Sequence, residues 1–297
     1  PTTEELQRVK HILRTRRLRA EESMEGQASE LVSWEALGGQ DVGDSYWAAV
    51  DSIAPRDVQR VLSDWCSDDT AAVVSYRGSA APPLAADGGE LVAAWNSATS
   101  RPLPAVSSSP VVVTRPSAVE PSERVGAVSV FRTSHGVPVL VRRKPGARIA
   151  HMGCFVYGGA AHESLSHAGL TSLVARTSLK GTLTRSAAQC AEDAERLGGS
   201  LSVAVSKELT SWSISVPLSE ATAAAVLLAD VVERASFPDD AVAAERAQLL
   251  AELRSRRDDM LRHPLALARQ ALFGQHTYAI DALGTQETVA ALDAGHV

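Results

Sequence analysis

Apolar positions along the chain repeat with two different spacings. Near the start, Leu6, Val9 and Leu13 recur at the spacing of a helix face. Thr2 and Glu5 fit a capping box, which predicts that this helix begins almost at the first residue. The arginines of residues 14–19 are followed closely by glutamates, which favours a solvated helix face over a nucleic-acid or lipid patch.

Residues 3–77 are predicted to form three or four helices and one strand. One helix ends at Gly38-Gly39, because glycine takes the left-handed conformation that stops a helix. Pro55 opens another, and its buried face is expected to carry Val58, Val61, Leu62 and Trp65. A strand follows over residues 71–76. One strand cannot bury several helices, so this part is expected to be the end of a larger domain.

The composition changes between residues 79 and 126. Half of the 14 prolines lie in this stretch, together with a run of three serines at 107–109. Such a composition predicts a linker that is extended in its proline-rich parts. Within it, residues 111–113 are a candidate strand and residues 91–95 a candidate helical turn.

After residue 126 the pattern is that of a fresh domain. Strands are predicted over 128–131 and 137–141, joined by a turn at His135-Gly136, and over 149–157. Helices over 167–178 and from Ser186 to Gly198-Gly199 precede two more strands, 200–206 and 210–216. Two helices complete the order, one capped by Ser219 and ending near residue 235, the other starting at Phe237-Pro238. This order indicates an α+β fold, with an antiparallel-rich sheet and helices packed on one face.

Composition excludes several classes of function. The chain of 297 residues has a formal net charge of -6, whereas neutralising nucleic-acid phosphates takes a clustered excess of Lys and Arg. No stretch approaches the roughly 20 apolar residues that cross a bilayer, and the first residues lack the pattern of a signal peptide. We therefore expect a soluble protein that binds neither nucleic acid nor membrane. The three cysteines are far apart and odd in number, which argues against disulfides and a zinc or redox motif, so we expect them to be small buried apolar groups: Cys66, Cys154 and Cys190.

One stretch carries a family resemblance. Residues 158–182, GGAAHESLSHAGLTSLVARTSLKGT, contain the Gly158-Gly159 pair, Glu163, and the triplets 168–170 (Ala-Gly-Leu) and 180–182 (Lys-Gly-Thr). In this order they resemble the start of a pitrilysin or insulinase type domain, of the M16 zinc metallopeptidases related to mitochondrial processing peptidase. The resemblance continues through residues 197–200 and 237–238 to Glu245 and Glu252, and residues 3–77 resemble the end of the partner domain.

The resemblance implies a domain organisation. Proteins of this family close two homologous halves, each of two similar α+β domains, around a peptide. Residues 1–78 would be the C-terminal part of one M16-like domain, 79–126 the linker between halves, and 127–297 the first domain of the second half. The chain would then be a piece of a longer protein.

The same comparison implies that the zinc motif is missing. Active members carry an HxxEH motif between the Ala-Gly-Leu and Lys-Gly-Thr landmarks, with two zinc-binding histidines and a glutamate general base. Here the histidine positions hold Ser172 and Arg176, and the general-base position holds Ala175. None can do the required chemistry. Glu252 stands at the third-ligand position and Glu245 at that of a supporting carboxylate.

Two smaller predictions concern charge. Arg176 is hypothesised to replace the metal by pairing with Glu252 or Glu245. His162 and His167 flank Glu163, and we interpret them as exposed loop histidines rather than metal ligands.

The resemblance implies a function without catalysis in this segment, which has neither catalytic nor metal-binding residues of its own. The segment would enclose and bind an oligopeptide or small unfolded protein. This peptide would be hydrolysed at a zinc site in the active half of the parent metalloendopeptidase or in a homologous active subunit. The alternative is a pseudo-peptidase, a scaffold or binding subunit with no hydrolytic activity. An HxxEH motif elsewhere in the parent or partner would separate the two.

Overall fold

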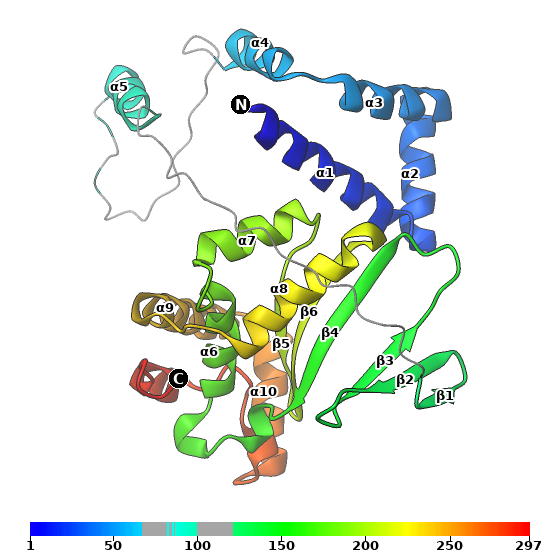
Figure 1. Ribbon diagram of the computed structural model, residues 1–297. Coiled ribbons are helices and arrows are strands. Elements are labelled where there is room, and N and C mark those ends of the chain that lie inside the picture. The colour runs from blue at the N-terminus through cyan, green and yellow to red at the C-terminus, as the bar shows by residue number, and fades with distance from the viewer. Residues whose placement is uncertain (67–81, 83–84, 86, 100–120) are drawn as a thin grey trace. The chain divides into compact units, whose positions relative to one another are not determined.

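The computed structural model describes residues 1–66, 82, 85, 87–99 and 121–297 (Figure 1). The strands predicted at 71–76 and 111–113 lie outside these residues. The chain divides into two compact units. Unit 1 comprises Pro1–Lys10 and Ser29–Ser107, and unit 2 comprises His11–Ala28 and Ser108–Val297.

Unit 1 is helical in its described part. Its helices are the start of α1 (Thr3–Ala20), most of α2 (Met24–Leu37), then α3 (Gln40–Ser52), α4 (Pro55–Trp65) and α5 (Gly88–Thr99). The predicted capping box of α1 is confirmed: the Glu5 N–H donates to Thr2 Oγ1 over 3.1 Å, and the Thr2 nitrogen donates to Glu5 Oε2 over 2.7 Å. The predicted helical turn at 91–95 lies within the longer helix α5.

A buried lysine and three aromatic rings hold unit 1 together. Lys10 is 4% exposed, and its ammonium donates to the carbonyl oxygens of Asp51 and Ile53 at 2.8 and 2.7 Å. Those carbonyls lie at the C-terminal end of α3, where the helix dipole favours a cation. The ring of Tyr46 contacts those of Trp34 and Trp47, tilted against the first and edge-to-face with the second, with centroids 5.4 and 5.3 Å apart.

The prediction that α4 buries one face is wrong for the described residues. No residue of α4 is buried, and Val61, Leu62 and Trp65 are all exposed. The spacing of these apolar residues does form one helix face. Within the described part of unit 1, however, no element covers that face.

The sheet of unit 2 has three antiparallel strands in the order β4-β6-β5. They are β4 (Ile149–Tyr157), β5 (Ser202–Val205) and β6 (Leu209–Pro217), with Val203 opposite Trp212 and His151 opposite Ser215. A second antiparallel sheet contains β1 (Glu123–Val125), β2 (Val128–Arg132) and β3 (Pro138–Arg142). The predicted turn joins β2 to β3, and its Gly136 has φ 81°.

Helices cover one face of the β4-β6-β5 sheet (Figure 1). Ile214 and Val216 of β6 are buried against Leu227 of α8 (Ala221–Glu233) and Ala194 of α7 (Ala187–Arg196). Between them, Ser215 points to the opposite face, because side chains alternate along a strand. This α+β arrangement, with helices on one face of an antiparallel sheet, is the predicted fold class.

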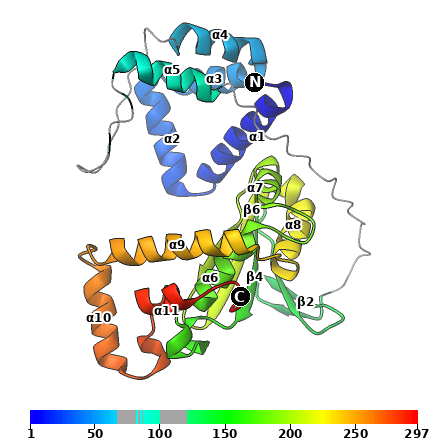
Figure 2. The ribbon, with the colours of Figure 1, turned by 90° about the vertical axis from the view of Figure 1, so that its left-hand side faces the viewer.

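A second core lies among three other helices. Leu173 of α6 (Leu170–Thr177), Leu249 of α9 (Asp239–Arg256) and Val289 of α11 (Gln286–Ala291) are fully buried together. Figure 2 shows α9 running away from the sheet to α10 (Arg262–Phe273), with α11 lying against α9. This core fixes α6 against α9, the two helices that carry the predicted site residues.

Two local predictions are corrected in unit 2. The helix predicted from residue 167 begins only at Leu170, because residues 165–167 form a separate 3-10 turn and Gly169 has φ 96°. Ser219 does not cap α8, since Glu220 holds the cap position and the Ser219 hydroxyl donates to the Glu220 carboxylate.

The basic segment at the end of α1 is only partly solvated. Arg14 and Arg16 are exposed, as predicted. Arg19 instead donates to the carbonyl oxygens of Gly198, at 3.0 Å, and Ser215 within unit 2. Its guanidinium satisfies backbone acceptors beside the sheet, a role that the charge pattern alone does not reveal.

Candidate functional site

Helix α6 carries three of the five predicted site positions, and a buried glutamate fixes its start. Glu163 is 9% exposed, and its two carboxylate oxygens accept hydrogen bonds from the backbone N–H groups of Gly169 and Thr171, at 2.8 and 2.5 Å. A carboxylate at this end of a helix satisfies orphan N–H groups and is stabilised by the helix dipole. Thr288 adds a bond from its hydroxyl to the Ala168 carbonyl oxygen, at 2.7 Å.

Two of the three α6 positions face the protein interior. Ser172 and Ala175 are 3% and 1% exposed. The Ser172 hydroxyl donates to the carbonyl oxygen of Ala282, so its proton is directed at a neutral acceptor in the protein. Ala175 offers no polar side-chain atom.

The third position, Arg176, makes an ion pair with α9. Its Nη2 lies 2.8 Å from Oε2 of Glu252, and both side chains are half-buried. The hypothesised pairing is therefore present, with Glu252 as the partner. Glu245 lies seven residues before Glu252 on α9 and pairs with Lys180, whose Nζ is 2.9 Å from Glu245 Oε1. Of the five predicted positions, three therefore take part in ion pairs and two face the interior.

The two carboxylates at this site, those of Glu245 and Glu252, are already paired with cationic side chains. Among the residues that the structure describes, no three His, Cys, Asp or Glu side chains are grouped so as to hold a metal ion. Each of the two glutamates accepts from a positively charged nitrogen. The chemistry available at this point is therefore ion pairing and hydrogen bonding.

A sheet edge lies beside this pair of helices. Strand β5 pairs with β6 along one side, and no other described strand pairs with its second side. Helix α6 packs close to β5, so the unpaired edge and Arg176 belong to the same region of unit 2. Unpaired N–H and C=O groups on a strand edge are a ready template for an added strand.

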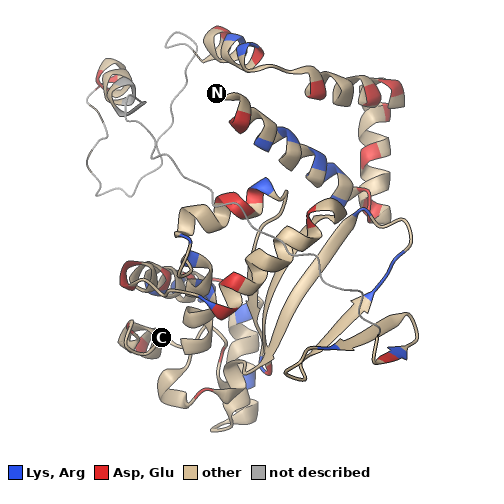
Figure 3. Cartoon of the chain, in the orientation of Figure 1, with Lys and Arg blue, Asp and Glu red and all other residues tan. Residues whose placement is uncertain are grey.

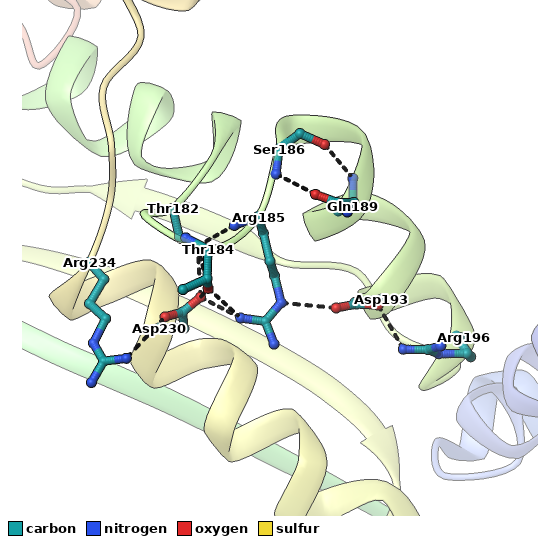
Figure 4. Close-up of polar contacts among 9 residues, drawn as sticks. All are labelled: Thr182, Thr184, Arg185, Ser186, Gln189, Asp193, Arg196, Asp230 and Arg234. Atoms are coloured by element: carbon teal, nitrogen blue, oxygen red, sulfur yellow. Dashed lines mark hydrogen bonds and ion pairs between the residues drawn. The ribbon is translucent and has the colours of Figure 1, made fainter. Parts of the chain in front are cut away.

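Sequence reasoning missed a buried ion network behind the site. Figure 4 shows the Arg185 guanidinium lying between Asp193 of α7 and Asp230 of α8. Its Nε is 2.9 Å from Asp193 Oδ2 and its Nη1 is 2.5 Å from Asp230 Oδ2, with all three side chains nearly buried. Burial alone would lower the pKa of Arg185, but the hydrogen bonds to Asp193 and Asp230 leave that pKa raised, so the cation is held firmly.

The network also anchors the loop that follows α6. The Thr182 hydroxyl donates to Asp230 Oδ2 over 2.8 Å (Figure 4). Ser186 and Gln189 form the predicted cap of α7, with a bond of 2.8 Å from the Ser186 N–H to the Gln189 side chain. The sequence places Asp193 and Asp230 on two different predicted helices, but nothing in it indicates that Arg185 pairs with both, because the pairing joins segments far apart in the chain.

The predicted loop histidines are exposed, as expected. His162 and His167 line a shallow pocket of about 410 Å³ together with His296, whose ring centroid is 5.8 Å from that of His167. The ring nitrogens are used locally: His167 Nδ1 contacts the Ser164 hydroxyl at 2.8 Å, and His296 Nδ1 contacts Asp293 at 2.7 Å.

Basic and acidic residues are interspersed over the helices of unit 2 (Figure 3). Lys and Arg are found on α10 and on the segment between β3 and β4, while α9 carries both signs. Across the described residues, every helix is too short or too polar to cross a membrane.

The chain is similar to known zinc proteases. A family model described as insulinase (peptidase family M16) matches residues 138–285. The uncharacterized zinc protease YmxG of Bacillus subtilis is 28% identical over 165 residues, which are 55% of this chain and 40% of that protein. An uncharacterized zinc protease of Mycobacterium leprae is 32% identical over 157 residues, 53% of this chain and 35% of that protein.

The fold is also similar to solved structures. A peptidase M16 inactive domain from Pseudomonas fluorescens superposes with a TM-score of 0.53 at 19% identity, over 57% of this chain and 41% of that one. A protease from Helicobacter pylori gives a TM-score of 0.53 at 16% identity, with the same coverage. The chain spans about two fifths of the length of these proteins.

Proposed function

Because residues 138–285 belong to peptidase family M16, we propose that unit 2 is a non-catalytic portion of an M16-like zinc metalloendopeptidase. It binds and encloses peptide, and the peptide bond is hydrolysed at a zinc site elsewhere in the parent protein or in a partner subunit. The observation that carries the proposal is the Arg176–Glu252 ion pair beside the unpaired edge of β5.

The residues at the family's metal position do not fit zinc. Ser172 directs its hydroxyl proton at Ala282, and Ala175 has no proton acceptor for a general base. Arg176 brings a permanent positive charge into the space that a dication would need, and it engages Glu252. One remaining carboxylate cannot hold a catalytic zinc ion. We therefore derive no chemical step through zinc in this chain.

What unit 2 retains is a peptide-binding surface. An extended peptide would pair with the open edge of β5 through backbone hydrogen bonds, which require no catalytic side chain. Alternate side chains of that peptide would point to the two faces of the sheet, because side chains alternate along a strand. The substrate class is thus an oligopeptide or small unfolded protein in extended conformation.

The same proposal covers the chain's organisation and partners. Residues 1–78 are the C-terminal part of one M16-like domain, residues 79–126 the linker, and residues 127–297 the first domain of a degenerate half. The partners are the remaining parts of the parent protein, or a homologous active subunit. Zinc belongs to that active half.

Backbone methylation of a peptide tests the binding mode. A fluorescent octapeptide would be compared with variants that are N-methylated at one amide each, and their binding to the chain measured by fluorescence anisotropy. Pairing with β5 predicts that every second N-methyl group weakens binding, because alternate amides face the strand edge. Equal effects at all amides, or binding that a zinc chelator abolishes, would contradict the proposal.

A scaffold role is the second candidate. Helix α10 and its N-cap residue expose three leucines, Leu261, Leu265 and Leu272, at 78%, 57% and 76%, which suits attachment to another protein part. In this reading the parent is a pseudo-peptidase with no hydrolytic activity. Zinc content of the complete parent protein, with peptide cleavage measured before and after chelation, separates the two candidates.

A further inference from the structure

A cavity of about 580 Å³ lies at the end of β5, next to the Arg176–Glu252 pair. Its wall includes Lys207 in the turn after β5, Arg256 of α9, Arg269 of α10 and Asp281. Phe273 and Tyr278 supply aromatic surface to the same cavity. All of these residues belong to unit 2.

Cationic residues outnumber acidic ones in this wall, although Arg262 Nε also lies 3.6 Å from Asp259 Oδ2 outside it. Four cationic residues line the cavity, against two acidic ones: Lys207, Arg256, Arg262 and Arg269, against Glu252 and Asp281. Glu252 is already engaged by Arg176, which is not part of the lining. Asp281 lies 2.6 Å from Arg256 Nη1 but 4.0 Å from Arg269 Nη1, so Arg269 is only weakly compensated.

Two buried donors in the wall have no acceptor among the described residues. They are Nζ of Lys207 and Nε of Arg256. Burial, and next the positive charge of Arg269, lower the pKa of Lys207. Glu208, the neighbouring anion in sequence, accepts instead from the hydroxyl of Tyr278. Buried donors without partners are destabilising, and an anionic ligand would satisfy them.

The cavity also lies where a bound peptide would reach it. Val205, the last residue of β5, and Ser206 both line it. A peptide strand paired with β5 would therefore place one of its side chains over the cavity as it passes the end of the strand. Phe273 and Tyr278 would contact the carbon atoms of that side chain, and the cations its charged end.

We propose that this cavity is a specificity site for an acidic residue of the bound peptide, whose carboxylate is held by Lys207, Arg256 and Arg269. The site rests on the proposed peptide binding at β5 and adds to it a preference for Asp or Glu at one position. The ligand chemistry is a carboxylate attached to an extended backbone.

The test uses two matched series of fluorescent octapeptides with amidated C-termini. One Asp is moved through a Ser- and Thr-rich sequence in the first series, and one Asn in the second. The site predicts one position at which Asp improves affinity for the chain about tenfold over Asn, the effect of a charge-assisted hydrogen bond. Lys207→Gln should reduce this ratio to about twofold or less, and Arg143→Gln, which changes an exposed arginine after β3, should leave it unchanged.

The outcomes separate this inference from peptide binding itself. If Asn peptides bind to the Lys207→Gln variant as tightly as to the parent, that variant is folded and its loss of preference supports the site. Equal affinities for Asp and Asn at every position of the parent would overturn the site while peptide binding stands. If neither series binds, both the site and the proposed peptide binding are overturned.

A neutral peptide with a free C-terminus shows whether a terminal carboxylate occupies the cavity in place of a side chain. Preference for that peptide alone would also overturn the side-chain assignment.

Discussion

The guanidinium of Arg176 lies 2.8 Å from the carboxylate of Glu252, and this contact joins α6 to α9. An arginine thereby neutralises a carboxylate that, in the proposed relation to active M16 domains, would otherwise bind a metal ion. Glu252 is therefore not an uncompensated charge. The strength of this contact can be measured.

Glu252→Gln is expected to lower the free energy of unfolding by about 0.5–1 kcal/mol. The loss is modest because both side chains are half-exposed and solvent screens the pair. Urea unfolding of the single variant, of Arg176→Met and of the double variant would give the coupling energy. Zinc content, measured in parallel by mass spectrometry, should be the same in parent and variant. A zero coupling energy would refute the pair.

Restoring the two histidine positions is expected to create a metal site. Ser172→His together with Arg176→His would place two imidazoles one helical turn apart, with Glu252 as third ligand. The double variant should bind one zinc ion per chain, whereas either single variant should not. Isothermal titration with zinc sulfate measures this. If the double variant binds no more zinc than the parent, the proposed correspondence with the family's metal ligands is wrong.

Asp230→Asn is expected to destabilise unit 2 by about 3 kcal/mol, because it leaves the nearly buried Arg185 without one of its two counter-charges. Arg234→Gln provides the control. Arg234 also approaches Asp230, but at 3.9 Å and with 60% of its side chain exposed, so its loss should change stability by less than about 0.5 kcal/mol. Denaturation followed by circular dichroism compares the two. Similar losses in both variants would mean that burial does not set the strength of this network.

Gly159→Ala is expected to cost about 2 kcal/mol through a steric clash. A Cβ atom at this position would lie 2.4 Å from the Ser206 carbonyl oxygen and 2.6 Å from that of Lys207, and backbone atoms cannot move aside cheaply. Its φ of -100° is open to any residue, so strain in the dihedral does not contribute. Gly88→Ala, where nothing lies within 4 Å, is the matched substitution and should not destabilise. Unfolding midpoints of both variants decide the matter.

Lys207 predicts a pH dependence of stability. Its pKa is lowered in the folded chain by burial and by Arg269, so between this lowered pKa and the ordinary value of 10.5 the unfolded chain binds more protons than the folded one. Stability should therefore rise with pH across that window, relative to Lys207→Met. The difference between the unfolding free energies of the two proteins, followed from pH 7 to pH 10, measures it. A difference that stays constant or falls would show that burial does not disfavour the charged lysine.

The local elements of unit 2 were largely predictable from the sequence. Ile149–Tyr157 emerges as one strand because glycines end it, and α7 begins at its predicted cap because Ser186 and Gln189 satisfy each other's backbone N–H groups. The helices α10 and α11 were not predicted. The pattern there is interrupted, and α10 has no buried residue whose spacing could mark a face.

The candidate site was predictable in its residue types and less so in its contacts. The charges predicted that Arg176 pairs with either Glu252 or Glu245. The sequence did not indicate that Lys180 pairs with Glu245, which leaves Glu252 as the partner of Arg176. The Arg185 network and the cavity at Lys207 depend on segments brought together only by the tertiary fold. Periodicity reports which face of an element is buried, but carries no information about which distant polar group will meet it there.

The anchoring of α6 by Glu163 is separate from the site positions on that helix. The Glu163 carboxylate accepts from the backbone N–H groups of Gly169 and Thr171, and the Thr288 hydroxyl donates to the Ala168 carbonyl oxygen. None of these bonds involves the side chains at 172, 175 or 176. Substitutions at those three positions therefore leave this anchor intact. A helix held in this way can change the side chains that it presents without losing the bonds that fix its first turn.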